Sequence, residues 1–269
     1  MLSYLSRGFT YVLAFLYAVL GFLLFFFHAQ LAPVFAWKVT PFMAMTIGGW
    51  CLGNAWLARI TARRWRWSLV FSALIYLWLF GLGELLVLFL FRDRLVLSHP
   101  IAWLYLTTLI GNALAAVVGI VDWFRLRPTL DSTYPEFTPW QWAATLAFIL
   151  FAGFLGVYGL FAPMGAPGTN GGIFPEVMSP FTLRSFGMFY LTLALGVVPF
   201  LWHRNLNAIL HHAFASYGFI VFITAAAFVY IGLFDFVIRP GGLLYFAAYL
   251  AVGIPLILIF RRQGTGAPA

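Results

Sequence analysis

The sequence predicts an all-helical protein that crosses a membrane several times. Hydrophobic residues make up 64% of the 269 residues, charged residues make up only 8%, and the mean hydropathy is +0.97. A water-soluble surface requires a much larger charged fraction. Within a bilayer every backbone polar group must find its partner inside the chain, and a helix meets this condition by itself. The long apolar runs are therefore expected to be transmembrane helices.

Eight apolar segments are long enough to span a bilayer, which takes about 20 residues in a helix. The first could be taken for a secretory signal peptide, because Ala29-Gln-Leu-Ala32 behind it resembles a cleavage site. Its counterpart in the second half of the chain argues instead for a helix of the mature protein. The eight segments are expected near residues 9–28, 41–60, 67–91, 101–123, 140–163, 180–201, 208–234 and 241–260.

A motif at the start of the second segment returns 139 residues later, at the start of the sixth. The copies run from Phe35 to Gly48 and from Phe174 to Gly187, and both carry Thr or Ser, then Pro-Phe, then Gly at the same spacing. Shorter matches join segments one and five at spacing 133, and segments four and eight at spacing 140. We therefore predict two tandem four-helix halves, residues 1–127 and 140–269, joined by a cytoplasmic connector, residues 128–139. Four is an even number, so both halves enter from one side, in parallel orientation.

The distribution of Lys and Arg predicts that both chain termini are cytoplasmic, because basic residues gather on the inner side of a membrane. The same distribution explains the net charge of +8. The expected partner is therefore the lipid bilayer, with other membrane subunits as an open alternative and no nucleic acid. The inner set is Arg7, Arg59, Arg63, Arg64, Arg66, Arg125, Arg127, Arg204, Arg261 and Arg262, and the outer set is Lys38, Arg92, Arg94, Arg184 and Arg239.

Four polar residues inside apolar segments form the candidate polar site: Glu84, Arg184, Asn54 and Asn112. An ionisable side chain within a membrane is costly and usually faces protein or water. Glu84 and Arg184 lie at comparable expected depths, and each lacks a charged counterpart in the other half, so we consider them a candidate ion pair. The alternative is an Arg184 that extends to the interface and a protonated Glu84 between helices.

Each copy of the repeated motif places a helix entrance on the outer side. Thr40 and Ser179 suit the N-cap position, and Pro41 and Pro180 suit the first helical position. Two such helix starts near a pseudo-twofold axis could alternatively bind an anion.

Asp93 and Asp235 end segments three and seven on the same outer side. Each has an Arg within a few residues, which favours local ion pairs. The alternative is that they form a repeated outer rim.

Cofactor sites have weaker support. The single cysteine, Cys51, rules out an internal disulfide and a multi-cysteine metal site. His203 and His211 flank one short inner loop and are weak haem candidates, and we predict no metal site. The 31 phenylalanines leave a hydrophobic ligand, such as a quinone, a pigment or a lipid tail, as an open alternative.

Small residues in segments two, four and five predict that these three helices form an inner bundle, because small side chains let helix backbones approach in lipid. They are Gly49, Gly53, Gly111, Ala115, Gly119, Gly153, Gly156 and Gly159.

Catalytic motifs are missing from the sequence, which has no P-loop, no GxSxG, no HExxH and no run of intramembrane carboxylates. The leading hypothesis is a non-catalytic accessory or hydrophobic-ligand-binding subunit of a membrane assembly. The alternative is a small transporter of solutes or ions with its path between the two halves. A weaker alternative is a haem- or quinone-binding membrane protein.

Overall fold

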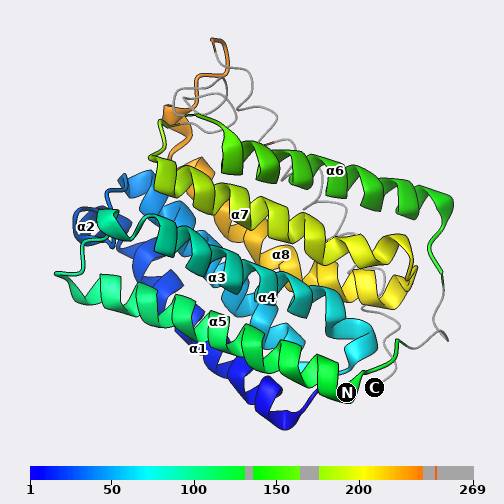
Figure 1. Ribbon diagram of the computed structural model, residues 1–269. Helices are drawn as coiled ribbons and strands as arrows, with labels where there is room; N and C mark the ends of the chain where they lie inside the picture. Colours follow the sequence, from blue (N-terminus) through cyan, green and yellow to red (C-terminus); the bar gives the residue numbers. More distant parts are fainter. Residues whose placement is uncertain (131–135, 164–175, 239–245, 247–269) are drawn as a thin grey trace.

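The computed structural model describes residues 1–130, 136–163, 176–238 and 246, and within these residues the secondary structure is helical (Figure 1). Four short 3-10 helices are η1 (Ala32–Val34), η2 (Arg92–Arg94), η3 (Val198–Leu201) and η4 (Ile231–Leu233), and one short α-helix is α2 (His28–Leu31). The long helices are α1 (Tyr4–Phe26), α3 (Pro41–Arg63), α4 (Trp67–Leu90), α5 (Pro100–Leu126), α6 (Pro139–Phe161), α7 (Pro180–Val197) and α8 (Leu206–Val229).

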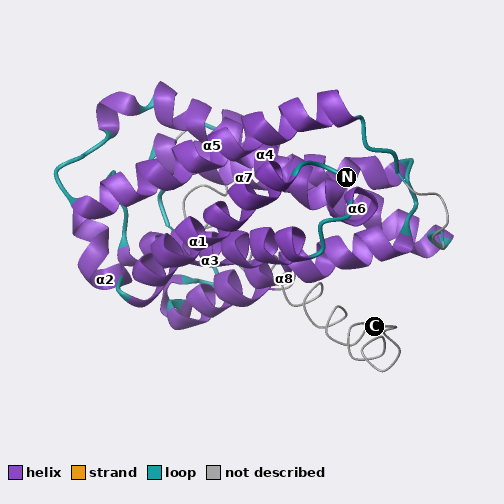
Figure 2. Ribbon diagram, turned by 90° about the horizontal axis from the view of Figure 1, so that it is seen from below, coloured by secondary structure: helices purple, strands orange, loops and turns teal. Residues whose placement is uncertain are grey.

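These seven long helices coincide with the first seven predicted segments, and the eighth, residues 241–260, lies outside the described residues except for Phe246. Six of them, α7 being extended by η3, are long and apolar enough to cross a membrane. The structure is therefore compatible with a multi-pass membrane protein. The long helices lie side by side with roughly aligned axes (Figure 2).

Hydrogen-bonding side chains set the helix starts. The hydroxyl of Thr40 accepts the Met43 amide at the start of α3, and the hydroxyl of Ser179 accepts the Thr182 amide at the start of α7. Pro41 and Pro180 follow directly as the first helical residues. Such a cap replaces a hydrogen bond that the first turn of a helix lacks.

The start of α1 was harder to place from the sequence. This helix begins at Tyr4, five residues before the expected residue 9, because Ser3 caps it by accepting the Ser6 amide. The apolar run thus marks the part of the helix that is hydrophobic enough to cross a membrane, whereas the cap marks where the helix begins.

Helix α3 occupies the centre of the bundle, and 17 of its 23 residues are buried. Its most extensive contact is with α1, and it also packs against α8 and α4. Of the long helices α3 is the least apolar, and it is the one that does not qualify as a membrane span by composition. Since protein surrounds α3, its residues do not need the hydropathy that a lipid-facing helix requires.

The predicted inner bundle is correct for α3 and wrong for α5 and α6. Helices α5 and α6 lie at opposite edges of the bundle in Figure 1, and α7 packs between α6 and α4. Side chains such as Leu114 on α5 and Leu150 and Phe154 on α6 are exposed. The glycines of α6 face α7 alone, as Gly156 does at Leu191. Those of α5 face two helices, Gly111 at Leu16 of α1 and Gly119 at Trp78 of α4.

Glycine allows direct backbone contact in the two closest helix pairs. A Cβ atom on Gly48 of α3 would lie 2.5 Å from the Phe25 nitrogen of α1. A Cβ atom on Gly187 of α7 would likewise collide with the Leu160 nitrogen of α6. Neither contact can move aside like the tip of a flexible side chain. Both pairs therefore depend on glycine at these positions.

We expect Gly48→Ala and Gly187→Ala each to lower the free energy of unfolding by about 1–3 kcal/mol, the usual cost of overpacking a tight contact. Unfolding of the purified protein in mixed detergent micelles measures this free energy. The matched control is Gly8→Ala, because no atom lies within 4 Å of a Cβ at Gly8. Equal stability of all three variants would contradict the backbone contacts.

Candidate functional site

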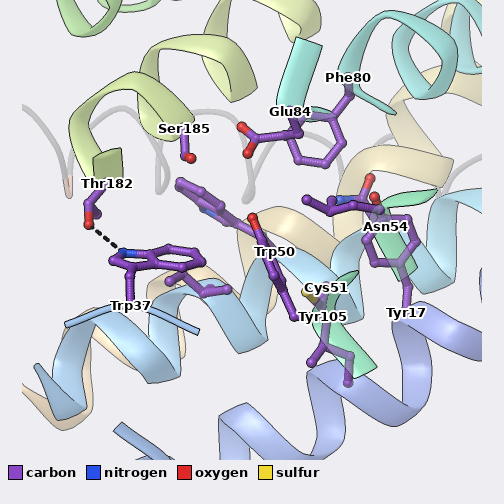
Figure 3. Close-up of a pocket in the computed structure, with 13 residues that line it drawn as sticks. Tyr17, Trp37, Trp50, Cys51, Asn54, Phe80, Glu84, Tyr105, Thr182 and Ser185 are labelled. Carbon is purple, nitrogen blue, oxygen red and sulfur yellow. Dashed lines mark hydrogen bonds between the residues drawn. The ribbon is translucent and has the colours of Figure 1, made fainter. Parts of the chain in front are cut away.

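A small cavity lies at the centre of the helix bundle, beside α3 (Figure 3). Its volume is about 30 Å³, in which one or two water molecules fit. Helices α1, α3, α4, α5 and α7 contribute to its wall, together with the loop that leads into α3. The lining residues are Tyr17, Leu20, Trp37, Ile47, Trp50, Cys51, Asn54, Phe80, Glu84, Tyr105, Leu109, Thr182 and Ser185.

Several polar atoms in this wall are buried without a hydrogen-bond partner in the part of the chain that the structure describes. They are Oε1 of Glu84, Nδ2 of Asn54, Oγ of Ser185 and Nε1 of Trp50. Glu84 is only 2% exposed and Asn54 is fully buried. Each buried polar group without a partner costs about 1–3 kcal/mol, so four around one cavity are a marked departure from ordinary packing. Their arrangement suits a bound polar species.

Neighbouring hydrogen bonds fix the orientation of the two asparagines. The Tyr76 hydroxyl donates to Oδ1 of Asn54 at 2.9 Å, which leaves Nδ2 free. Nδ2 of Asn112 donates to the Tyr17 hydroxyl at 2.8 Å, and Tyr17 lines the cavity. Asn112 therefore belongs to the shell behind the cavity, where its Oδ1 has no partner.

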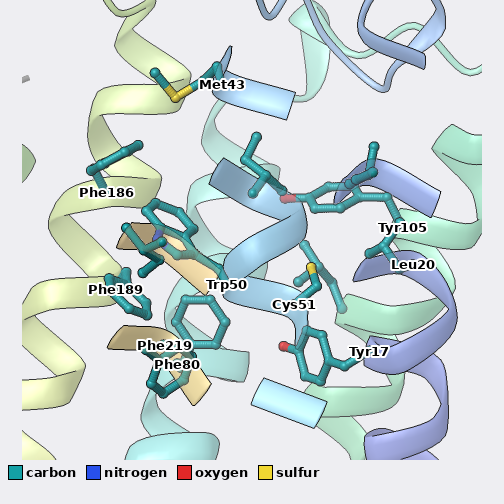
Figure 4. Close-up of a cluster of buried hydrophobic side chains, with 14 of the residues drawn as sticks. Tyr17, Leu20, Met43, Trp50, Cys51, Phe80, Tyr105, Phe186, Phe189 and Phe219 are labelled. Carbon is teal, nitrogen blue, oxygen red and sulfur yellow. The ribbon is translucent and has the colours of Figure 1, made fainter. Parts of the chain in front are cut away.

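Aromatic rings form much of the remaining wall. Trp37 donates from Nε1 to the hydroxyl of Thr182 at 3.0 Å, and its ring stacks on Phe181 at 4.2 Å between centroids. Trp50 stacks on Phe189 at 4.6 Å, with the two rings nearly parallel (Figure 4). Trp37 and Trp50 are thus held against α7, and their positions are fixed before any ligand binds.

Of the four residues in the candidate polar site, the structure brings three together and separates the fourth. Glu84 and Asn54 line the cavity, and Asn112 lies behind it. Arg184 instead donates to the carbonyl oxygens of Gly159 and Ala162 at 3.0 and 2.9 Å, at the C-terminal end of α6. Carbonyl groups at a helix C-terminus attract cations.

The proposed Glu84–Arg184 ion pair does not form. Both residues belong to the described part of the chain. Equal depth in the membrane does not place two residues on facing sides of their helices. Ser185, the residue after Arg184, is the one that faces the cavity.

The two helix entrances lie next to each other. The hydroxyl of Thr40 donates to the carboxyl group of Glu176, close to the Trp37–Thr182 hydrogen bond. Partial burial raises the pKa of Glu176, an effect that the Thr40 hydrogen bond opposes. Because Thr40 and Ser179 cap their own helices and a carboxyl group already occupies this end, the arrangement favours the cap interpretation over an anion site.

Of the two expected local ion pairs, the one at Asp93 does not form within the described residues, and the one at Asp235 is not tested. Asp93 is exposed, and its neighbour Arg92 donates to the Phe89 carbonyl and lies over the Phe89 ring. Asp235 is also exposed, and it accepts the amides of Val237 and Ile238 in a local turn. Arg239, the expected ion-pair partner of Asp235, lies outside the described residues.

The two haem candidates differ in environment. His203 is exposed in the loop after η3, whereas His211 is buried on α8. The neighbouring His212, which was not a predicted site residue, contacts the hydroxyls of Ser72 and Ser216 at 3.0 and 3.3 Å. Among the described residues no group of three or more His, Cys, Asp or Glu side chains could hold a metal ion.

Sequence reasoning did not find the aromatic part of the cavity. Trp37, Trp50 and Tyr105 look like ordinary membrane aromatics in the sequence. One available signal was position, since Trp50 lies in the middle of its predicted segment and away from the interface that Trp prefers.

Comparison of the chain with protein-family models, with curated proteins and with solved structures finds no match.

We expect the effects of Glu84→Gln and Arg184→Gln on the free energy of unfolding to add within about 0.5 kcal/mol, as for residues that share no interaction. The double-mutant cycle is measured on the purified protein. Tyr17→Phe with Asn112→Ala is the positive control, because this pair is hydrogen-bonded and should couple. A coupling energy for Glu84 and Arg184 as large as that of the control would show that they interact.

Proposed function

We propose that this integral membrane protein binds a small polar solute in the central cavity and moves it across the membrane, which is the transporter alternative. The observation that carries the proposal is the set of unpartnered buried atoms of Glu84, Asn54, Ser185 and Trp50 around one cavity. Natural proteins rarely leave such groups unsatisfied unless a ligand or water completes them. A few convergent polar groups in an otherwise apolar pocket are typical of small-molecule sites.

The hypothesis of a hydrophobic ligand finds less support at this cavity. A quinone ring, a pigment or a lipid tail is far larger than one or two water molecules. An apolar ligand would also leave the same polar atoms without partners. The role of an accessory subunit stays a prediction, which association with other membrane proteins would test.

Two tandem four-helix halves are part of the proposal, and the helix contacts support them. The two most extensive contacts are α1 with α3 and α6 with α7, which are equivalent pairs under the proposed repeat. The next two contacts are α3 with α8 and α4 with α7. The proposed repeat makes α3 equivalent to α7 and α4 equivalent to α8, so these two contacts are also equivalent. Trp50 and Phe189 occupy equivalent positions and stack on each other, as side chains beside a pseudo-twofold axis would.

The glycine contacts support the same repeat and adjust its register. In the first half, Gly48 of α3 lies against Phe25 of α1; the corresponding contact in the second half is that of Gly187 with Leu160. The contact of Gly21 with Leu52 corresponds in the same way to that of Gly156 with Leu191. Under the proposed repeat, these contacts favour spacing 139 for the second segment of each half, as in the motif, and spacing 135 in place of 133 for the first segment.

The orientation of the protein, with both termini cytoplasmic, remains part of the proposal. In that orientation the starts of α3 and α7 face outward, and Trp37 lies at the outer end of the cavity. The Trp37–Thr182 hydrogen bond and the stacking on Phe181 then form the outer closure that a passing solute must open.

We expect Ser185→Leu to remove solute flux, because the larger side chain fills the cavity. The measurement is the swelling rate of proteoliposomes in a panel of small solutes: urea, glycerol, ammonium chloride and sodium acetate. Wild-type protein should speed the entry of at least one of them, and the variant should match protein-free liposomes.

The matched control for this variant is Ser216→Leu, since Ser216 lies on α8 and does not line the cavity. Elution of both variants as monodisperse proteins in gel filtration checks their folding. Swelling that is the same in wild-type protein and in Ser185→Leu for every solute would overturn the proposed function.

A further inference from the structure

We propose that the solute of the central cavity is a small protonated amine, with the ammonium ion as its simplest member. This inference rests on the proposed function, because it assumes that the cavity binds a solute, and it adds the charge and chemical class of that solute. Four features of the cavity carry it: its single carboxyl group, its aromatic walls, its donor and acceptor pattern, and its size.

Glu84 is the one carboxyl-bearing residue among the thirteen that line the cavity, and no Lys or Arg lines it. Its Oε1 atom has no hydrogen-bond partner, and within the described residues no Lys or Arg forms an ion pair with it. A buried carboxyl group in a medium of low dielectric constant takes up a proton unless a positive charge joins it, so the ionised form of Glu84 needs a cation as its partner. A cationic solute supplies that charge, whereas an anionic solute would be repelled.

The aromatic walls favour the same sign of charge. Rings of Tyr17, Trp37, Trp50, Phe80 and Tyr105 line the cavity together with Glu84. The face of an aromatic ring is electron-rich and attracts a cation, with Trp the strongest of the natural side chains. Trp37 and Trp50 are held by stacking on α7, so in the closed arrangement both rings stay beside a ligand in the cavity.

The donors and acceptors suit an amine better than a metal ion. Ca²⁺ and Mg²⁺ need six or more oxygen ligands in close array. The unpartnered atoms of the wall include two nitrogen donors, Nδ2 of Asn54 and Nε1 of Trp50. An ammonium ion donates hydrogen bonds to Glu84 Oε1 and Ser185 Oγ, and the two nitrogen donors fit the oxygen atom of an accompanying water molecule.

The size of the cavity limits the amine to a small one. One or two water-sized species fit into about 30 Å³, which matches an ammonium ion with one water molecule. Figure 3 shows Glu84 and Ser185 on facing helices, α4 and α7, with the Ser185 hydroxyl close to the Glu84 carboxyl group, so that an ion beside the two would contact both.

Cys51 provides a built-in reporter, since it lines the cavity and is the single cysteine of the sequence. The experiment measures how fast the small uncharged reagent methyl methanethiosulfonate modifies Cys51 in purified protein, followed by intact mass. Cys51→Ser shows that the added mass is at this residue. The rate is compared in ammonium chloride and in sodium chloride of equal ionic strength, at one fixed pH.

We expect ammonium to slow the modification about threefold at a concentration of twice its dissociation constant, because the unoccupied fraction falls as 1/(1 + [L]/Kd). Glu84→Gln should react with the reagent and lose the protection by ammonium. Glu176→Gln is the matched control, since that carboxyl group lies outside the cavity, and it should keep the protection.

The outcomes separate this inference from the proposed function. Protection by uncharged urea but not by ammonium would overturn the amine and leave solute binding in place. Protection by no solute of the panel would overturn both. If Cys51 does not react, the midpoint of thermal unfolding decides: ammonium should raise it relative to sodium in wild-type protein and not in Glu84→Gln, and an equal midpoint overturns the inference.

Discussion

Enclosure of α3 by the surrounding helices is the constraint on which the rest of the structure depends. A transmembrane helix in contact with lipid must present an apolar surface, and this requirement leaves little room for polar side chains. Because α1, α4 and α8 cover α3, it can carry Asn54, Cys51 and Trp50 on its inner turns. The close approach that encloses it relies on Gly21 and Gly48, where backbone meets backbone. The polar cavity is thus a consequence of tight packing around one helix.

The arrangement of hydrogen bonds around the cavity divides the polar groups into two sets. Tyr76 donates a hydrogen bond to Asn54, and Asn112 donates one to Tyr17. These two hydrogen bonds fix the side chains of Asn54 and Tyr17 in place. Glu84, Ser185 and Trp50 line the same cavity with atoms that have no hydrogen bond of standard geometry among the described residues. A scaffold of satisfied groups that holds a few unsatisfied ones is the pattern expected of a preorganised binding site.

Helix positions followed from the sequence wherever a local rule determined them. Thr40 and Ser179 before proline placed the starts of α3 and α7, since capping depends on neighbouring residues alone. The polar residues Glu84, Asn54 and Asn112 were found because charge and amide groups are rare in apolar segments. Pairing of Glu84 with Arg184 was wrong because depth does not determine which way a side chain points around its helix. The glycines of α5 and α6 were misread for a similar reason: a glycine shows that something approaches closely, but not whether the helix is central or peripheral.

The adjacency of Trp50 and Phe189 has an evolutionary consequence under the proposed duplication. Two separate identical subunits would place the same residue on both sides of such an axis, so every change near it would occur twice. A fused chain escapes that restriction, because each copy can mutate alone. Glu84 illustrates the gain: a symmetric dimer would bring two carboxyl groups toward the shared interior, where they would repel each other, whereas the single chain keeps one.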